Sequence, residues 1–139
     1  MSRVSRFGVS LEKELLKRFD AYIKKLGFKN RSEAIRNLIR HRLVEEEWKE
    51  EKKESVGIVG LVYDHHRREL QEKLTDIQHE HLSIIIASMH VHLDEHNCLE
   101  VIVLKGKVDL IKKTADQLLA TRNVKYGKLI MATTGANLV

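Results

Sequence analysis

The sequence predicts an α+β chain in two parts, a β-α-α segment followed by a β-α-β-β-α-β segment. Three observations lead to this prediction. Polar and apolar residues alternate over residues 6–11, apolar residues recur at helical spacing over residues 15–43, and apolar runs of strand length alternate with helical patterns from residue 56 onward. No run of about 18 apolar residues occurs, so we expect no membrane span.

The first part is expected to be a short strand and two helices. The alternation in Arg6–Leu11 is typical of a half-buried strand, and the first helix should end at Gly27. Asn30 and Glu33 have the spacing of a capping box, in which Asn30 accepts a hydrogen bond from the first turn and Glu33 reaches back. The apolar faces of the two helices contain Leu15, Leu16, Phe19, Ile23 and Leu26, then Ala34, Ile35, Leu38, Ile39 and Leu43.

The predicted strand has no partner within its own part of the chain. A lone strand of about five residues leaves backbone groups unpaired on both edges and is not stable. Two copies from two chains could pair as an antiparallel ribbon flanked by four helices. We therefore predict an obligate dimer for this part of the chain.

The charge of the chain is uneven. The net charge is +5, but residues 1–42 hold twelve Lys or Arg against four Asp or Glu, whereas the remaining residues hold thirteen against sixteen. A basic part on an acidic body indicates a nucleic-acid-binding module, although charge alone also fits an uneven solvated surface. The start of the chain lacks the apolar core of a signal peptide, which favours the cytoplasm.

A charged segment separates the two parts. Nine of the ten residues in Glu45–Glu54 are charged, as in the exposed end of a helix that runs into a linker. Trp48 is the exception and could pin the helix to another element. We therefore expect one domain over residues 1–50, a linker over 51–55 and a second domain over 56–139.

The second part is expected to form a four-stranded antiparallel sheet with two helices on one face, an order shared by ferredoxin-like folds and ACT-type regulatory domains. The expected strands are 58–63, 83–93, 98–104 and 124–134, and the expected helices are 67–79 and 108–121, with a polar turn at 94–97. The other sheet face should carry Ile84, Ile86, Ile102 and Leu104, and a second copy of the domain is the simplest cover for it.

A group of metal-donor residues lies at the predicted hairpin of this sheet. His90 and His92 are two apart in a strand, so both imidazoles leave the same face. The turn brings Cys98 alongside, and one thiolate with two imidazoles suits late first-row divalent metals. His79 lies about half a turn around its helix from the apolar stripe, so it points outward and could bind the same metal across a subunit interface. Glu100, two residues past Cys98 on the same face, could orient the ligands.

Each of these residues also has an ordinary structural explanation. A His-x-His pair in a strand is more often partly exposed than metal-bound, and a lone cysteine is usually a small core residue. The joint pattern, together with the turn, favours the metal site. Other histidines are expected to be solvated, with at most weak binding of extra metal; these are His41, His65, His66 and His96.

The strand-helix-helix order, with the segment NRSEAIR at residues 30–36, resembles the ribbon-helix-helix repressors. This resemblance implies that the ribbon enters the major groove of DNA and that the amide end of the second helix holds a phosphate. The resemblance places on DNA the ribbon residues Arg6, Gly8 and Ser10 and the helix-end residues Asn30, Arg31 and Ser32.

Almost the whole chain resembles the nickel-responsive regulators of that class. The motifs are QHEH at residues 78–81, HVHLDEHNCLEVIVLKG at 90–106 and the NRSEAIR segment. This resemblance implies one Ni(II) per subunit, bound in a plane by His90, His92 and Cys98 of one chain and His79 of a neighbour. It also implies a homotetramer whose metal-loaded form represses nickel-uptake genes at a double-stranded DNA operator with two half-sites.

One position departs from the family pattern. Members often have Glu and Asp where this chain has Glu33 and Asn37, and there a second cation bridges the two domains. An amide is a weaker cation ligand than a carboxylate. The substitution by Asn37 therefore weakens the site to which Glu33 would belong.

Other function classes stay open at this point. A ribbon-helix-helix regulator could respond to copper or zinc, or to an amino acid through its ACT-like domain, and the sequence itself does not separate nickel from copper. A metal-dependent enzyme is disfavoured because no nucleophile–base pair is evident and four protein donors leave no open position on the metal. An antitoxin is disfavoured because its second half would normally be disordered before it met a toxin.

Overall fold

A computed structural model describes residues 3–139, which divide into two compact units. The first unit contains the residues up to Leu43 together with Asn137–Val139, and the second contains Val44–Ala136. The elements are α1 (Lys13–Leu26), α2 (Arg31–Glu47), β1 (Glu54–Asp64), α3 (Arg68–Glu80), β2 (Ile85–His92), β3 (Asn97–Lys107), α4 (Val108–Leu119) and β4 (Val124–Met131). This order is the predicted one apart from the first strand. No helix within residues 3–139 is long and apolar enough to cross a membrane.

The connection between the two helices of the first unit forms as predicted. Gly27 follows α1 in the left-handed conformation, with a φ of 79°, and its N–H donates to the Lys24 carbonyl at 3.2 Å. The Asn30 side chain accepts a hydrogen bond from the Glu33 N–H at 2.9 Å. The glycine stop and this half of the capping box are therefore confirmed.

Residues 3–12 form neither a strand nor a helix in the single chain. The strand predicted at 6–11 is thus absent here, because its hydrogen-bonding partner would have to come from a second chain. Of the helix positions predicted to face inward, Ile23 and Ala34 are buried. Exposed apolar side chains of this unit include Phe7, Val9, Leu11, Leu15, Leu26, Leu38, Ile39 and Leu43. This exposure agrees with a unit that is completed by dimerisation.

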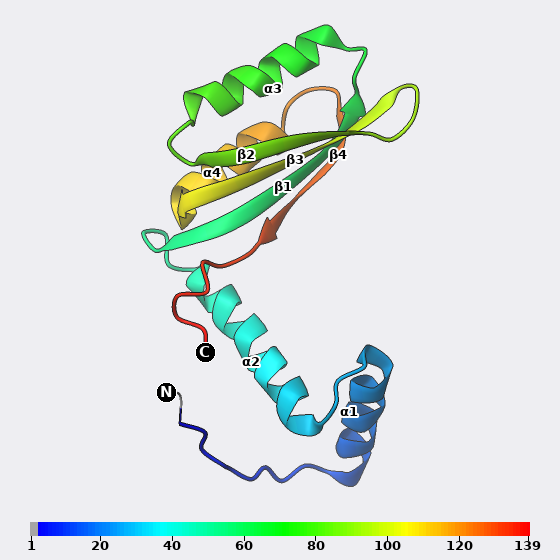
Figure 1. Cartoon of the computed structure of the whole chain (residues 1–139), viewed down its shortest axis with the longest axis vertical. Coiled ribbons are helices and arrows are strands. Elements are labelled where there is room, and N and C mark those ends of the chain that lie inside the picture. The colour runs from blue at the N-terminus through cyan, green and yellow to red at the C-terminus, as the bar shows by residue number, and fades with distance from the viewer. Residues whose placement is uncertain (1–2) are drawn as a thin grey trace. The chain divides into compact units, whose positions relative to one another are not determined.

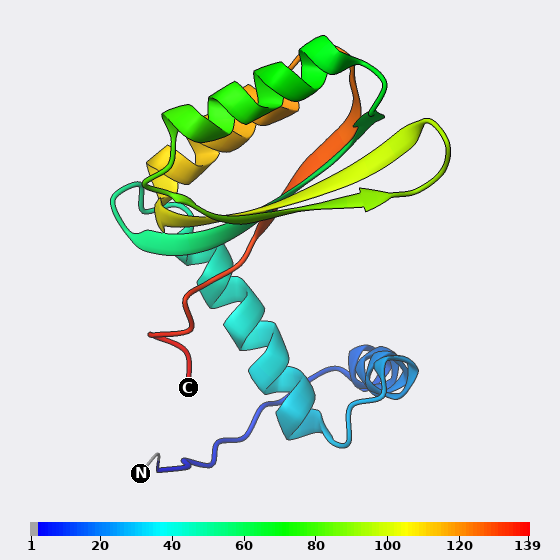
Figure 2. The same cartoon turned by 45° about the horizontal axis from the view of Figure 1, so that its top comes forward.

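The second unit is a four-stranded antiparallel sheet with α3 and α4 on the same face, as predicted (Figures 1 and 2). The strand order is β2-β3-β1-β4, so the β2–β3 hairpin forms one edge of the sheet. Along β1, buried residues alternate with half-buried ones because the helices cover only one face. The core lies between that face and the two helices.

The helix-covered face contains residues that the sequence places on the opposite side. Ile84, Ile102 and Leu104 are predicted for the uncovered face, but all three are buried in the core. Ile102 and Leu104 alternate in phase with Cys98 and Glu100 along β3, which places all four toward the helices. The prediction is wrong because β3 is apolar on both faces, and its pattern alone does not tell which face the helices cover.

The uncovered sheet face is apolar as well. Ile86, which is predicted for this face, is exposed, and a bulge between Ile85 and Ala87 shifts the register of β2. A sheet with one solvated face normally alternates apolar and polar residues, and this sheet does not. The half-buried or exposed apolar residues of the face include Val56, Ile58, Val62, Met89, Val91, Leu99, Val101, Val103, Tyr126 and Ile130.

The last turn of α2 packs within the second unit. Trp48 is 2% exposed, and its indole N–H donates to the Ala132 carbonyl at 2.9 Å. Glu47 is buried beside it. The boundary between the compact units therefore falls after Leu43, earlier than the expected domain end at residue 50. The start of β1 lies within the segment 51–55 that was expected to be a linker.

Candidate metal centre

The β2–β3 hairpin brings the predicted metal donors together on the helix-covered face of the sheet. His92 pairs with Cys98, and His90 pairs with Glu100, across the antiparallel ladder. Residues opposite each other in such a ladder have Cβ atoms about 4.5–5.5 Å apart on one face. These four side chains therefore share one small area of the sheet, in agreement with the predicted strand parity.

Two of the donors are already in contact. His90 Nδ1 lies 3.9 Å from Cys98 Sγ, and Cys98 is 1% exposed. The His92 ring instead lies beside the His65 ring, with 5.2 Å between the ring centroids. Within residues 3–139, His92 does not join His90 and Cys98 in a group whose donor atoms all lie within 4.8 Å. The single chain thus presents a partly assembled donor set.

Buried Glu100 fixes the orientation of the His90 ring. Its carboxylate lies 3.1 Å from His90 Nε2 and accepts hydrogen bonds from the Tyr63 hydroxyl and the Gln78 side-chain amide, each at 3.2 Å. With the proton on Nε2, the lone pair of the ring lies on Nδ1. Nδ1 is the nitrogen beside the Cys98 thiol, and the Tyr63 hydroxyl that lies 3.4 Å from it would have to give way to a bound metal.

Tyr63 and Gln78 are site residues that the sequence does not single out. Tyr63 lies on β1 opposite Cys98, and its hydroxyl is 3.4 Å from His90 Nδ1. Gln78 is buried near the end of α3, one residue before His79. Two signals could have found them. Tyr63 shares the strand parity of the core positions of β1, and Gln78 is a polar residue that directly follows the last apolar residue of the α3 stripe.

His79 lies in the last turn of α3 and is exposed, as its helical phase predicts. Among the described residues, it belongs to no group of three metal donors. His81, which falls on the apolar stripe, is half-buried, and its Nε2 lies 2.8 Å from the Gln117 side-chain oxygen.

The polar turn between β2 and β3 is held by Asp94. Its carboxylate accepts hydrogen bonds from the backbone N–H groups of His96 and Asn97 and from the Asn97 side chain, at 2.7 to 3.2 Å. These hydrogen bonds lower the pKa of Asp94 to about 2, and those from the Asn97 side chain have the largest effect. The turn directly precedes Cys98, so Asp94 helps to fix where the cysteine enters the sheet.

We expect the metal-free protein to lose stability as the pH rises above 10 because of Tyr63. Burial, followed by the charges of Glu100 and Cys98, raises the pKa of this phenol well above its ordinary value of 10.0. The resulting stabilisation is complete below the unfolded-state pKa and is lost as the pH rises toward the raised folded-state value. Phenolate absorbance should show a late phase that is missing in Tyr63→Phe. If Tyr63→Phe instead removed phenolate absorbance that develops near pH 10.0, Tyr63 would titrate like an ordinary tyrosine and this expectation would be wrong.

The residues predicted to bind DNA are exposed on the first unit. They are Arg6, Gly8, Ser10, Asn30, Arg31 and Ser32. The Arg31 guanidinium donates two hydrogen bonds to the Asp20 carboxylate, both at 2.9 Å, and this contact lowers the pKa of Asp20. An exposed ion pair contributes little to stability, but this one orients the guanidinium near the start of α2. Glu33 and Asn37 are half-buried, one helical turn apart.

Comparison with known protein families accounts for both units. A model of the ribbon-helix-helix proteins of the copG family matches residues 5–46. A model described as the NikR C terminal nickel binding domain matches residues 56–132, more than half of the chain. The chain belongs to the NikR family. The NikR family consists of ribbon-helix-helix transcriptional regulators and not of enzymes, so the prediction of a non-enzymatic regulator is confirmed.

Relatives of similar length agree with membership in the NikR family. A protein of Caldanaerobacter subterraneus subsp. tengcongensis is 55% identical over 135 residues, which cover 97% of this chain and 88% of the relative. Proteins of Geobacter sulfurreducens and Pyrococcus furiosus are 54% and 52% identical, over 99% and 98% of this chain and 99% of each relative. All three carry the name "Putative nickel-responsive regulator".

One solved structure resembles the fold of part of the chain. It is that of an uncharacterized protein from Thermotoga maritima, with 18% identity and a TM-score of 0.50. The match covers 56% of this chain and 96% of the other protein. At this identity the likeness concerns the fold alone. Together with the two family models, the described elements confirm the predicted fold class, a ribbon-helix-helix domain followed by an ACT-like α+β domain.

Proposed function

We propose that this chain represses nickel-uptake genes when Ni(II) is bound, one ion per subunit, at His79, His90, His92 and Cys98. The observation that carries the proposal is the buried Cys98 thiol beside the His90 imidazole, within a domain of the NikR family. A thiolate with imidazoles suits Ni(II), Cu(II) and Zn(II), and family membership favours nickel. The bound ion would supply a positively charged crosslink between donors of two subunits.

Three of the donors would come from one chain and the fourth from a neighbour. His90 and Cys98 are in contact, and His92 would turn from His65 toward Cys98, its partner in the ladder. His79 is exposed at the end of α3, where it is available to the hairpin of another subunit. A site of this kind can be complete only in an assembly.

The proposed assembly is a cytoplasmic homotetramer with the second units at its centre. Its support is the apolar sheet face, on which Met89, Tyr126 and Ile130 are 57%, 65% and 56% exposed. An exposed apolar face of this extent is unusual on a monomer, and a second copy of the domain would bury it. Pairing of the first units would then give a ribbon-helix-helix dimer at each end.

The paired first units would bind a double-stranded operator with two half-sites. Arg6 and Ser10 would project from the ribbon into the major groove, and Gly8 has no side chain for base readout. The amide end of α2 at Asn30–Ser32 would hold a phosphate. A second cation at Glu33 is left out of the proposal because the neighbouring Asn37 supplies no carboxylate.

Operator binding with and without equimolar Ni(II), Cu(II) or Zn(II) tests the proposal. Ni(II) should raise operator affinity if it binds more tightly when the DNA-binding ends are arranged to fit the operator than when they are not. The gain in operator-binding free energy cannot exceed this difference in metal-binding free energy. A Ni–thiolate charge-transfer band that disappears in Cys98→Ser should accompany this effect. Equal operator binding with and without Ni(II) would contradict the proposal and favour a regulator that responds to another metal or to an amino acid.

Replacing His92 by alanine is expected to return operator affinity in the presence of Ni(II) to the metal-free level. The reason is that His92 lies opposite Cys98 and is not part of the core, so its loss removes a donor without unfolding the domain. A gel shift measures the affinity, and gel filtration checks that the assembly is intact. His41→Ala, which removes an exposed histidine on α2, is the control. An unchanged response to Ni(II) in the His92 variant would exclude His92 as a ligand.

A further inference from the structure

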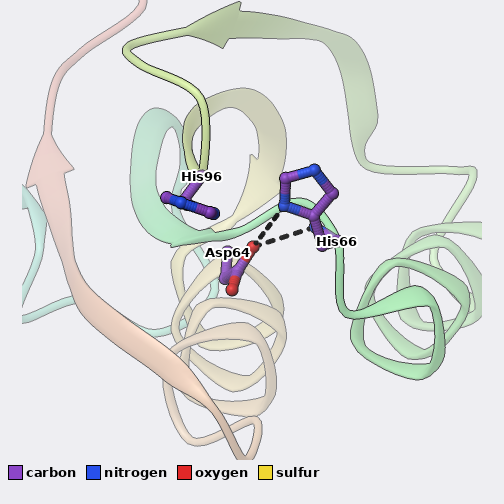
Figure 3. Close-up of side chains that lie close together, drawn as sticks. All are labelled: Asp64, His66 and His96. Carbon is purple, nitrogen blue, oxygen red and sulfur yellow. Dashed lines mark hydrogen bonds and ion pairs between the residues drawn. The ribbon is translucent and has the colours of Figure 1, made fainter.

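A second group of metal donors lies outside the centre described above. Asp64, His66 and His96 each offer one ligand atom, and these atoms all lie within 4.8 Å of one another (Figure 3). Asp64 ends β1, His66 follows in the connection to α3, and His96 lies in the turn between β2 and β3. We propose that these three side chains form an outer binding site for a divalent transition-metal ion.

Hydrogen bonds hold the two connections of this outer site together. Asp64 Oδ1 accepts the His66 N–H at 3.0 Å and lies 3.3 Å from His66 Nδ1. The His65 N–H donates to the His96 carbonyl at 3.0 Å, which ties the β1–α3 connection to the turn. The His96 N–H donates to Asp94 at 2.9 Å. The backbones of all three donors are thus fixed, and ion binding requires only side-chain rotation.

The donor atoms of the outer site are close enough to share one ion. Two ligands that each lie about 2.1 Å from a metal are at most about 4.2 Å apart. This separation applies only to ligands on opposite sides of the ion, and tetrahedral ligands lie about 3.4 Å apart. A pair of donor atoms at the 4.8 Å limit would therefore have to approach by roughly 0.6–1.4 Å. The rings of His66 and His96 already lie 5.4 Å apart between centroids, and both residues are exposed and can rotate.

The donor types define the class of ion. Two imidazoles and one carboxylate suit Ni(II), Co(II), Cu(II) or Zn(II), whereas Mg(II) and Ca(II) prefer oxygen ligands alone. Three protein donors leave the remaining positions to water. The outer site is exposed and contains no thiolate, so it should bind more weakly than the centre at Cys98 and exchange its ion faster.

An ion at the outer site would join two segments that lead into the elements with the proposed nickel ligands. The β1–α3 connection leads into the helix that ends near His79, and the turn leads directly into Cys98. Ligand binding to the folded state stabilises it by an amount that grows with ligand concentration above the dissociation constant. Excess metal would therefore stiffen the hairpin through the outer site after the inner donors are filled.

The Cys98→Ser/His92→Ala double variant isolates the outer site, because it removes two inner donors and leaves Asp64, His66 and His96 in place. Equilibrium dialysis of this full-length variant with Ni(II) should still give one ion per chain at saturation. In nuclear magnetic resonance spectra, paramagnetic Ni(II) should broaden the ring-proton signals of His66 and His96 first. Adding His96→Ala should weaken Ni(II) binding at least about tenfold. Loss of a residue that only orients a metal ligand already weakens binding about 10- to 100-fold, and His96 would be a ligand itself.

Two further variants sharpen this test. Asp64→Asn keeps an oxygen that can accept the His66 N–H but removes the charge, so it should also weaken binding. His41→Ala, at an exposed histidine on another helix, should leave binding unchanged. Equal affinity of the His96 and His41 variants, or broadening spread over all exposed histidines, would overturn the outer site. Neither outcome bears on the proposed regulator, which the operator assay on the unmodified chain tests separately.

Discussion

Replacing Trp48 by alanine is expected to lower the free energy of unfolding of the second unit by roughly 3–5 kcal/mol, the range for removal of a buried aromatic side chain. Trp48 belongs to the core cluster of this unit. Its indole packs against the backbone of β1, since a Cβ added to Gly57 would lie only 3.3 Å from Trp48 Cη2. Small shifts of neighbouring side chains cannot fill a space of this size, so a cavity would remain.

Trp48→Phe separates burial from hydrogen bonding. It keeps an aromatic ring and loses the N–H that donates to the Ala132 carbonyl. That carbonyl also accepts a hydrogen bond from Ser55 Oγ at 3.1 Å, so it would not be left without a partner. We therefore expect a smaller loss for phenylalanine, roughly 1–2 kcal/mol.

Urea unfolding followed by far-UV circular dichroism measures both variants. Fluorescence is unsuitable because Trp48 is the only tryptophan of the chain. The same metal chelator should be present in all samples, since bound metal would add its own stabilisation. If alanine cost no more than phenylalanine, burial of the ring would not be what holds the end of α2 in the second unit.

Replacing Glu100 by glutamine is expected to weaken Ni(II) binding roughly 10- to 100-fold, the range for loss of a group that orients a metal ligand. This expectation rests on the proposed metal centre. The Glu100 carboxylate accepts from Tyr63 and Gln78 and lies 3.1 Å from His90 Nε2. A glutamine side chain has the same shape but brings its own N–H donors, so it cannot accept from all three groups.

Glu95→Gln is the matched control for this prediction. Glu95 is exposed in the turn between β2 and β3, so the substitution removes the same charge a few residues away without changing the buried network. Competition with a chelator of known affinity measures Ni(II) binding of both variants. Equal weakening would attribute the effect to net charge and not to the orientation of His90.

The secondary structure of the second unit follows from periodicity because its helices have one apolar face each. The predicted helix 67–79 becomes Arg68–Glu80, and the predicted helix 108–121 becomes Val108–Leu119. The prediction for β1 begins at residue 58 and misses its first four residues. The missed residues include Glu54 and Gly57, which carry no strand signal but pair with β3 through the backbone.

The identity of the covered sheet face could not be predicted from β3 itself. Leu99, Val101 and Val103 lie on one face, and Ile102 and Leu104 lie on the other, so alternation gives two equally apolar sides. The difference between the faces depends on where α3 and α4 pack, which is tertiary information. The bulge in β2 adds a register shift that the residue pattern does not predict.

The candidate metal centre was predictable where its geometry is local. Strand parity places His90 and His92 on one side, and the short turn returns Cys98 to that side. Tyr63 and Gln78 come from other elements, and only the packed fold brings them to Glu100. The position of the His92 ring beside the His65 ring could not be foreseen from spacing either.

The segment from residue 3 to residue 12 pairs with no strand among the described residues 3–139. A ribbon-helix-helix dimer takes one strand of its DNA-reading element from each of two chains, so no single polypeptide encodes that element. A chain with an altered strand that still dimerises would enter mixed dimers with intact chains. Such a mixed dimer would present one intact and one altered strand to DNA, so an altered chain would also weaken the DNA binding of the intact chain with which it pairs.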